Sequence, residues 1–412
     1  MHRIRGSAKD YAWGSTDAIP ELLGQPATDA PLAELWFGAH PAGAATLVDA
    51  PDSSLVDLLD DDPLGTLGAD VLERFGPHLP YLLKLIAPAR PLSLQVHPSL
   101  ERAQRRHAEE VAAGIPADRR NYADANHKPE LVYALTTFRA MSGFRAPRRA
   151  AELVAGLDVP LARRLQDELR ADRSGRGMRA AFTRLLDEAS RPTPAEVAEL
   201  AEACAARLTA GSPSPRADDN VVTLHAAYPG DPGVVASLLL NPVTLRPGEA
   251  MFVPAGSVHA YLSGLAVEIM ASSDNVLRAG LTAKRIDVGE MLQCVDYVAA
   301  PPIRIAPERF LESTRVFYAP VDDFELSVTE LPGDRAPCPL PGRGPRVILA
   351  LGGPVSVRSA SGAEVSLRDG ESVFVRADDG EVTVAPAGPP TREPGARDGT
   401  APGVTVIQAD VP

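Results

Sequence analysis

In the segment Thr244–Ala255 the sequence is Thr-Leu-Arg-Pro-Gly-Glu-Ala-Met-Phe-Val-Pro-Ala, and the segment Ser366–Ala377 repeats it as Ser-Leu-Arg-Asp-Gly-Glu-Ser-Val-Phe-Val-Arg-Ala. Each copy predicts a strand, a glycine turn and a second strand, which suits a hairpin of a jelly roll. Chance similarity of two hairpins is the alternative. The repeat favours two related β units.

The two copies differ in one chemically important position. His259 stands fifteen residues after the start of the first copy, whereas the same offset in the second copy falls on Glu381. We therefore expect the C-terminal unit to lack whatever site His259 belongs to.

Apolar runs separated by proline and glycine predict the other strands. These runs are Leu79–Leu85, Leu92–His97, Leu131–Tyr133, Val234–Leu240, Ala250–Val253, Val267–Met270 and Val404–Ile407. Over residues 146–220 the sequence is instead rich in Ala, Arg, Leu and Glu at helical spacing, which predicts helices. Within this segment Thr193 to Glu196 predicts a capping box. A shorter helix is predicted from Ser99 to about Gly114, and a loose loop from Pro386 to about Gly403.

Composition narrows the class of protein. The chain has 412 residues, a formal net charge of −13 and three cysteines without a CxxC pattern. Nucleic acid and anionic membranes are therefore not expected as partners, because both bind to dense basic patches on a protein surface. A reducing cytoplasm fits the cysteine usage, and no apolar run is long enough for a membrane helix. We expect a cytoplasmic protein that acts as a monomer.

Three polar clusters interrupt the apolar strands. In Leu92-Ser-Leu-Gln-Val-His-Pro98 the alternation of a strand puts Ser93, Gln95 and His97 on one face. Asn126-His-Lys-Pro-Glu130 spaces Lys128 and Glu130 two apart, and Pro254-Ala-Gly-Ser-Val-His-Ala-Tyr261 carries His259 after a glycine turn. Two imidazoles, a carboxylate and an amide oxygen make a four-ligand zinc set of Gln95, His97, Glu130 and His259.

Spacing alone leaves an alternative open. The same residues would also suit a polar core whose groups satisfy one another, because no short local ligand motif is present. Three further histidines, His40, His127 and His225, are expected to be structural or at the surface.

Longer motifs make the sequence recognisable. Tyr11-Ala-Trp-Gly14, Glu34-Leu-Trp-Phe-Gly-Ala-His-Pro41, Leu92–Pro98, Asn126–Glu130 and Ser273-Asp-Asn-Val-Leu-Arg-Ala-Gly-Leu-Thr-Ala-Lys284 resemble the type I mannose-6-phosphate isomerase family, in the family's order. The resemblance covers roughly residues 1–290. It implies a zinc-dependent isomerase that interconverts mannose 6-phosphate and fructose 6-phosphate and feeds nucleotide-mannose (GDP-mannose) synthesis.

The resemblance also implies the site and the fold. One zinc per chain would be held by the four ligands already selected, with an active-site arginine at Arg278. Other residues expected around the metal are Trp13, Lys84, Ser93, Lys128, Glu268, Asp274 and Lys284. The expected fold is mainly β: two cupin-type jelly-roll units with an α-helical insertion domain. We place a discontinuous catalytic unit at 1–145 and 221–315, the insertion at 146–220, and a degenerate C-terminal unit at 316–412.

The chemistry of each side chain indicates which step of the expected reaction it suits. Ser93, Lys84 and Lys284 suit the phosphate, which needs several cationic or hydroxyl donors, although a lone lysine more often belongs to the solvated surface. Arg278 stays protonated, so it suits orienting substrate and stabilising an enediolate better than abstracting a proton. Glu268 or Lys128 would move protons, and the sequence does not decide between them.

Two other classes compete with an isomerase. A cupin oxygenase would share the scaffold but hold iron and bind oxygen, and Gln95 speaks against it because such sites favour histidine. A non-enzymatic sugar-binding cupin would have little use for Lys128, Glu268 and Arg278 around a metal. Oxygen consumption would identify the first class, and turnover of a sugar phosphate would exclude the second.

Overall fold

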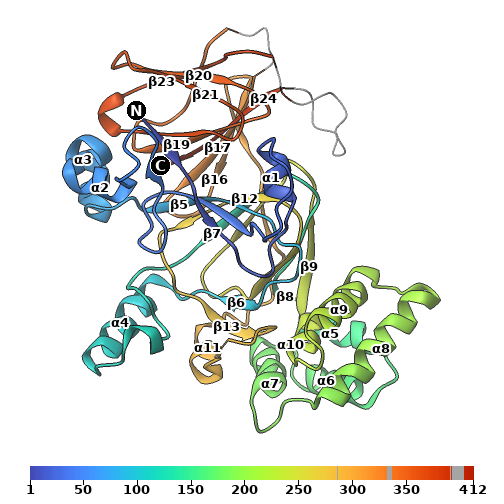
Figure 1. Cartoon of the computed structure of the whole chain (residues 1–412). Coiled ribbons are helices and arrows are strands. Elements are labelled where there is room, and N and C mark those ends of the chain that lie inside the picture. The colour runs from blue at the N-terminus through green and yellow to red at the C-terminus, as the bar shows by residue number, and fades with distance from the viewer. Residues whose placement is uncertain (285, 332–335, 390, 392–402) are drawn as a thin grey trace.

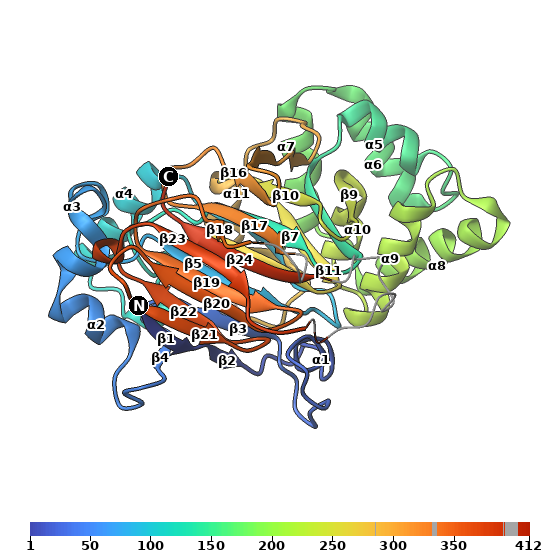
Figure 2. The ribbon, with the colours of Figure 1, turned by 90° about the horizontal axis from the view of Figure 1, so that it is seen from above.

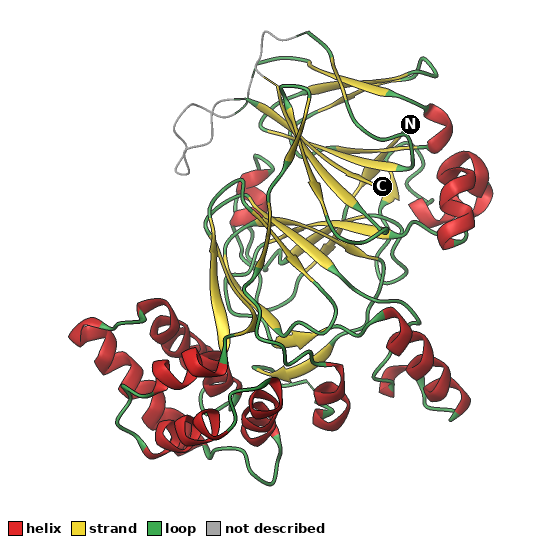
Figure 3. Ribbon diagram, turned by 180° about the vertical axis from the view of Figure 1, so that it is seen from behind, coloured by secondary structure: helices red, strands yellow, loops and turns green. Residues whose placement is uncertain are grey.

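The computed structural model describes residues 1–412 except 285, 332–335, 390 and 392–402. Its described part consists of four antiparallel β-sheets stacked on one another, with helices mainly at one end of the stack (Figures 1 and 3). The mainly β fold class predicted from the sequence is confirmed at this level.

Two sheets form the lower half of the stack in Figure 1. The seven-stranded sheet has the order β14 (Ile303–Ile305), β10 (Ala250–Val253), β7 (Glu130–Ala134), β12 (Ala266–Ala271), β5 (Tyr81–Ile86), β3 (Glu34–Phe37) and β2 (Ser7–Lys9). The five-stranded sheet has the order β13 (Leu277–Gly280), β6 (Leu94–Val96), β11 (His259–Ser263), β8 (Phe138–Phe144) and β9 (Leu240–Leu245).

The other two sheets form the upper half. The eight-stranded sheet has the order β15 (Glu308–Phe310), β16 (Thr314–Tyr318), β17 (Glu325–Leu331), β24 (Val404–Asp410), β19 (Arg346–Leu351), β22 (Ser372–Val375), β1 (His2–Arg5) and β4 (Thr46–Leu47). The four-stranded sheet has the order β18 (Cys338–Pro339), β23 (Val382–Pro386), β20 (Val355–Ser359) and β21 (Glu364–Leu367). Figure 2 shows this sheet lying over the eight-stranded one, seen from above.

The two halves have the same topology. In the lower half β7 pairs with β10 and β8 pairs with β9. In the upper half β19 pairs with β22 and β20 pairs with β21 in the same way. The correspondence continues, because β12 joins β7 as β24 joins β19, and β5 joins β12 as β17 joins β24. These strands therefore pair in the same order in both halves.

The repeated segments are not hairpins, however. Both copies form strand, turn and strand as predicted, but β9 and β10 lie in different sheets, and so do β21 and β22. A glycine turn can carry the chain across a sandwich as well as back along the same sheet, so the local sequence does not reveal the pairing.

Side-chain alternation produces a separate apolar core between each pair of sheets. Leu131 and Tyr133 of β7 face the eight-stranded sheet, where they meet Phe317 and Val347, while Val132 of the same strand faces the five-stranded sheet. A third core lies between the eight-stranded and four-stranded sheets and includes Ile348. Polar side chains on the inner faces of the lower two sheets therefore lie between those sheets.

Helices cover the outer face of the five-stranded sheet. They are α5 (Pro147–Val154), α6 (Pro160–Ala171), α7 (Gly175–Leu186), α8 (Pro194–Gly211), α9 (Pro215–Ala227), α10 (Gly233–Ala236) and the 3₁₀ turn η2 (Ser237–Leu239). Leu94 and Val96 of β6 belong to their apolar core. The capping box at Thr193 and Glu196 is confirmed, with both reciprocal hydrogen bonds present.

One predicted strand was wrong. Most of Val234–Leu240 forms α10 and η2, and only Leu240 begins a strand. The run is buried on all sides in the helical core, so it shows no period that would distinguish a helix from a strand.

The remaining helices are α1 (Ala18–Leu22), α2 (Leu55–Asp61), α3 (Pro63–Phe75), α4 (Leu100–Ala112) and α11 (Val288–Cys294), with the 3₁₀ turns η1 (Ala117–Arg119) and η3 (Ala377–Asp379). Helix α4 confirms the short helix predicted from Ser99, which is its N-cap. The final strand is confirmed as β24, whereas most of the predicted loop after Pro386 lies outside the described residues. Among the described residues, no helix combines the length and the apolar character needed to cross a membrane.

Candidate metal centre and active site

Three side chains converge between the seven-stranded and five-stranded sheets. His97 Nε2 lies 3.3 Å from one carboxylate oxygen of Glu130, and His259 Nε2 lies 3.4 Å from the other. All three residues are buried, and their ligand atoms lie within 4.8 Å of one another. Within the described part of the chain, this is the one such group that could hold a metal ion.

The register of three strands brings the predicted residues into one row. Gln95 of β6 pairs with His259 of β11 on one side and with Arg278 of β13 on the other. Side chains at directly paired positions are close neighbours on one face of a sheet. Gln95 is half-buried, and its amide has no hydrogen-bond partner among the described residues. Gln95 therefore lies next to His259 in the five-stranded sheet, two residues before His97.

Backbone carbonyls orient both imidazoles. His97 Nδ1 lies 2.7 Å from the carbonyl oxygen of Asn275, and His259 Nδ1 lies 3.1 Å from that of Ser257. A carbonyl can only accept, so each Nδ1 carries the proton and each Nε2 presents a lone pair. His97 Nε2 is completely buried and has no hydrogen-bond partner among the residues that the structure describes. An orphaned nitrogen beside a carboxylate and a second imidazole fits a metal ion, because burying it unpaired is costly.

The electrostatics of the cluster agree with this fit. Burial would raise the pKa of Glu130, but the positive charge that His97 and His259 carry when protonated outweighs burial and holds that pKa well below its usual value. A metal cation held there by neutral imidazoles would act on the carboxylate in the same direction. Burial lowers the pKa of His97, which favours the neutral ligand form. Tyr261 donates a hydrogen bond of 2.9 Å to Glu130 and so fixes its carboxylate.

A second charged group lies on the same face of the seven-stranded sheet. Lys84 of β5 donates to Glu268 of β12 at 3.0 Å, and both side chains are buried. Burial raises the pKa of Glu268. For Lys84, burial alone would lower the pKa, but the negative charge of Glu268 has the larger effect, so the pKa of Lys84 is raised. Lys128 lies 3.9 Å from Glu130, and burial, then the charge of Lys84, lower its pKa. Glu268, whose pKa is raised, and Lys128, whose pKa is lowered, therefore both lie beside the metal cluster.

Two cations extend the site along the five-stranded sheet. Arg278 is half-buried, and burial lowers its pKa. Lys284 is exposed, and burial of part of it, then the like charge of Arg278, lower its pKa. Neither has a carboxylate partner among the described residues. Ser93, just before β6, is half-buried on the face of Gln95.

The other predicted residues lie around this centre. Trp13 packs at the edge of the core between the two lower sheets, and Asp274 lies 3.6 Å from the buried His40. His127 contacts Asp323 at 3.0 Å, and His225 lies on α9. None of these three histidines belongs to the metal cluster.

Sequence reasoning missed the residues that orient the ligands. Tyr261 lies inside a motif already noted, and its spacing of two from His259 put it on the same face of β11. Asn275 acts through its backbone carbonyl, while its side chain bonds to the carbonyl oxygens of Asp124 and Asn126 at 2.8 and 2.7 Å. A backbone contact of this kind leaves no signal in the residue type.

The described positions of the upper half that correspond to this cluster carry other residues. Glu130 pairs with Val253 in β10, and Arg346 pairs with Val375, the repeat counterpart of Val253. By the same register, Gln408 stands where Glu268 stands in the lower half. Glu381, the counterpart of His259, is exposed and forms an ion pair with Arg343. A fully buried arginine thus occupies the position of the metal-binding carboxylate.

Comparison with known proteins places these features in one family. The model of the phosphomannose isomerase type I catalytic domain matches residues 1–147. Mannose-6-phosphate isomerase of Escherichia coli K12 is 38% identical over 393 residues, covering 93% of this chain and 97% of that protein. The human mannose-6-phosphate isomerase is 32% identical, covering 79% of this chain and 81% of that protein.

Solved structures agree. A mannose 6-phosphate isomerase bound with zinc and yttrium has a TM-score of 0.84 at 33% identity, covering 99% of this chain and 98% of that one. An alanine mutant of phosphomannose isomerase from Salmonella typhimurium has a TM-score of 0.85, also at 33% identity and with the same coverage.

The geometry predicts that all tightly bound metal occupies one site. Replacing His97 and His259 together with alanine should reduce the metal content of the purified chain from about one equivalent to none, because Arg346 replaces Glu130 in the upper half. Elemental analysis after gel filtration measures this. A double variant that keeps a stoichiometric metal would show a second centre and contradict the assignment.

Proposed function

This chain belongs to the type I phosphomannose isomerase family, and from that premise we propose that the cluster between the two lower sheets is the active site of a zinc-dependent mannose-6-phosphate isomerase. The reaction converts the aldose mannose 6-phosphate into the ketose fructose 6-phosphate through an enediolate. The observation that carries the proposal is the convergence of His97, His259 and Glu130 around an orphaned, buried nitrogen. The names of the relatives favour this class over an oxygenase or a sugar-binding protein.

We propose that zinc is held by Gln95, His97, Glu130 and His259. The donor set of two neutral nitrogens and two oxygens suits zinc, and the free amide of Gln95 supports its inclusion. When bound, the ion supplies a Lewis acid that polarises the sugar's carbonyl and hydroxyl oxygens.

The proton transfers are assigned to Lys128 and Glu268. A group that moves protons near neutral pH needs a pKa shifted toward that range, and burial lowers the pKa of Lys128 and raises that of Glu268. Lys84 keeps its proton and holds one oxygen of Glu268, so we assign Lys84 to the reacting end of the sugar and not to the phosphate. Isomerisation requires one proton to leave C2 and one to reach C1, and a second proton to leave the C2 hydroxyl oxygen while the C1 oxygen gains one. Lys128 and Glu268 are two neighbouring groups that can serve these transfers.

The phosphate is assigned to Ser93 and Lys284, with Arg278 between them and the metal cluster. Arg278 pairs with Gln95 across the sheet, so it lies next to the proposed ligands, whereas Lys284 follows six residues later. A dianion suits Lys284, an exposed cation without an acid partner among the described residues. Arg278 then faces the charge that develops on the enediolate. Trp13 and Asp274 complete the proposed substrate contacts.

We also propose that each half of the stack is a cupin-type jelly roll. The shared strand order of the two halves and the crossing of both repeated segments between sheets support this assignment. In the proposed division, residues 1–145 and 221–315 form the catalytic unit, 146–220 the helical insertion and 316–412 the C-terminal unit. Strands β1 and β4 are an exception to this division, because they pair into the eight-stranded sheet of the upper half although their residues are counted in 1–145.

The most direct test of the activity is a coupled assay. The purified chain should convert mannose 6-phosphate to fructose 6-phosphate, should lose this activity after removal of metal by a chelator, and should regain it when zinc is restored. Full activity after exhaustive dialysis against chelator would contradict the role of zinc. A chain that holds zinc but does not turn over the sugar phosphate would contradict the function.

Two alanine variants separate phosphate binding from chemistry. Lys284→Ala removes an interaction made equally in ground and transition states, so KM should rise about 10- to 150-fold with kcat little changed. Arg278→Ala removes stabilisation of developing charge, so kcat should fall about 10²- to 10³-fold with KM changed much less. Steady-state kinetics measure both, and metal content serves as the control. If Arg278→Ala raises KM and spares kcat, Arg278 is a phosphate anchor.

A further inference from the structure

The chain turns sharply between the two proposed cations. Gly280 ends β13 with φ of 143°, and Leu281 follows with φ of 57°. Leucine rarely adopts this left-handed conformation, because its Cβ approaches the neighbouring carbonyl oxygen. Leu281 is fully buried in the core of the helices, so the turn is fixed by packing. Strained residues of this kind persist where the surroundings determine them and are found at functional sites.

A carboxylate from the helical part of the chain holds this turn. Asp231, between α9 and α10, accepts a hydrogen bond of 3.0 Å from the backbone N–H of Leu281 through one oxygen. Its other oxygen accepts from the N–H of Gly233 at 2.7 Å. A Cβ on Gly280 would lie 3.1 Å from Asp231, so the carboxylate touches the chain at both residues of the turn.

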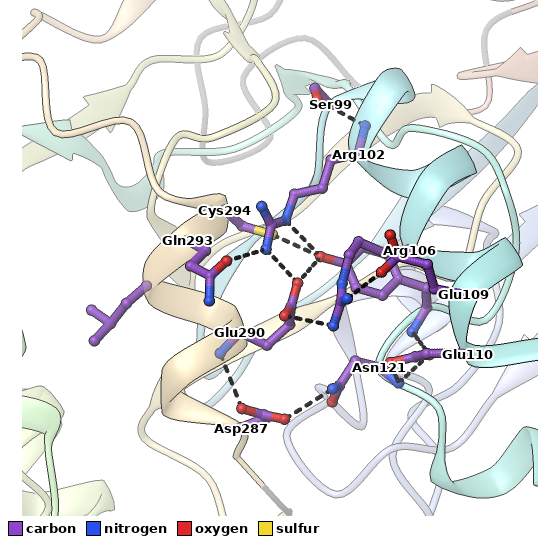
Figure 4. A network of polar contacts seen from close by, with 12 residues as sticks. Ser99, Arg102, Arg106, Glu109, Glu110, Asn121, Asp287, Glu290, Gln293 and Cys294 are labelled. Carbon is purple, nitrogen blue, oxygen red and sulfur yellow. Dashed lines mark hydrogen bonds and ion pairs between the residues drawn. The ribbon is translucent and has the colours of Figure 1, made fainter. Parts of the chain in front are cut away.

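Helix α11, further along the chain, is tied to α4 and to residues that follow α4. Asp287, the N-cap of α11, accepts from the side chain of Asn121 at 2.9 Å, and Glu290 accepts from Arg106 at 3.0 Å and from Tyr122 at 2.6 Å (Figure 4). Arg102 donates to Glu290 as well. These contacts lock α11 in place, so the direction in which the chain leaves β13 decides where Lys284 lies.

We propose that Asp231 is a positioning residue of the active site: from the helical part of the chain it fixes the left-handed turn at Leu281 and thereby places Lys284 beside Arg278. The proposal rests on the function proposed above, in which Lys284 meets the phosphate. Asp231 bonds to backbone N–H groups, and no ion pair joins it to either cation within the described residues, so it leaves their charge available to the substrate.

Electrostatics explains why the turn needs such a tether. Arg278 and Lys284 carry like charges, and no ion pair within the described residues holds the exposed ammonium group of Lys284, so the path of the backbone decides where that group lies. Holding Lys284 in advance of binding avoids an ordering cost when the phosphate arrives. The helical part of the chain would then contribute to substrate affinity although it carries none of the proposed metal ligands.

The experiment is a double-mutant cycle of Asp231 and Lys284 in the zinc-loaded, full-length enzyme. Asp231→Ala should raise KM for mannose 6-phosphate about tenfold, with kcat within about twofold and zinc content unchanged. Competitive inhibition by inorganic phosphate should weaken in parallel. In the Lys284→Ala background, Asp231→Ala should have little further effect on KM, because the side chain that it places is absent.

Controls separate positioning from a structural role. Asp187 accepts from the N–H of Ala189 at 2.9 Å in a similar turn of the helical part, so Asp187→Ala should leave KM unchanged. If Asp231→Ala does not fold, Asp231→Asn, which keeps one acceptor oxygen, should show a smaller rise with the same dependence on Lys284. Effects on KM that add in the double variant, or a loss of kcat alone, would overturn the proposal.

The same data distinguish failure of this proposal from failure of the proposed function. If Lys284→Ala leaves KM unchanged while the enzyme still turns over mannose 6-phosphate, the isomerase function stands and the positioning role falls with the phosphate assignment. If the wild-type chain does not isomerise the sugar phosphate, the function itself is wrong.

Discussion

The carboxylate of Glu130 is the constraint on which the rest of the site depends. It is 4% exposed between two sheets, where an unpaired charge would be costly. The two imidazoles and the Tyr261 hydroxyl surround it, and each comes from a strand of the five-stranded sheet or the residue that follows one. The register of β6 and β11 therefore has to be kept, because a slip of one residue would turn Gln95 and His259 away from Glu130. A metal ion is the natural complement of this arrangement, since it pairs with the carboxylate and with the orphaned nitrogen of His97 together.

The two halves of the stack carry residues of opposite charge at corresponding positions of the same strand pairing. Both halves of the stack use the same strand order, yet Glu130 in the lower half corresponds to Arg346 in the upper half. The Arg346 guanidinium donates to the backbone carbonyl oxygens of Gly342 and Gly380. In the upper half the positive charge of Arg346 is thus bonded to backbone carbonyl oxygens. At the corresponding place in the lower half, His97, Glu130 and His259 form a group that could hold a metal ion. The upper half also packs its apolar face against the seven-stranded sheet, so it supports the strands that carry Lys84 and Glu130.

Much of the site could be predicted from the sequence because strand alternation is local. The spacing of Gln95 and His97 put them on one face, and the structure places Leu94 and Val96 on the other. Pairing between sheets is not local, which is why the repeated segments were expected to be hairpins. The apolar run at Val234–Leu240 was misassigned because it is buried on all sides. Asn275 and Asp231 act on or through the backbone, and such contacts depend on the whole fold. The role of Gln95 as a ligand, and the division of labour among Arg278, Lys128 and Glu268, stay predictions.

The measurement that tests the central claim most directly is anomalous X-ray diffraction at the zinc edge from crystals of the zinc-loaded chain. The account predicts one strong peak per chain, between the two lower sheets, at bonding distance from Gln95, His97, Glu130 and His259, and none beside Arg346. A peak that lies elsewhere, or an ion in this place that Glu130 does not touch, would contradict it.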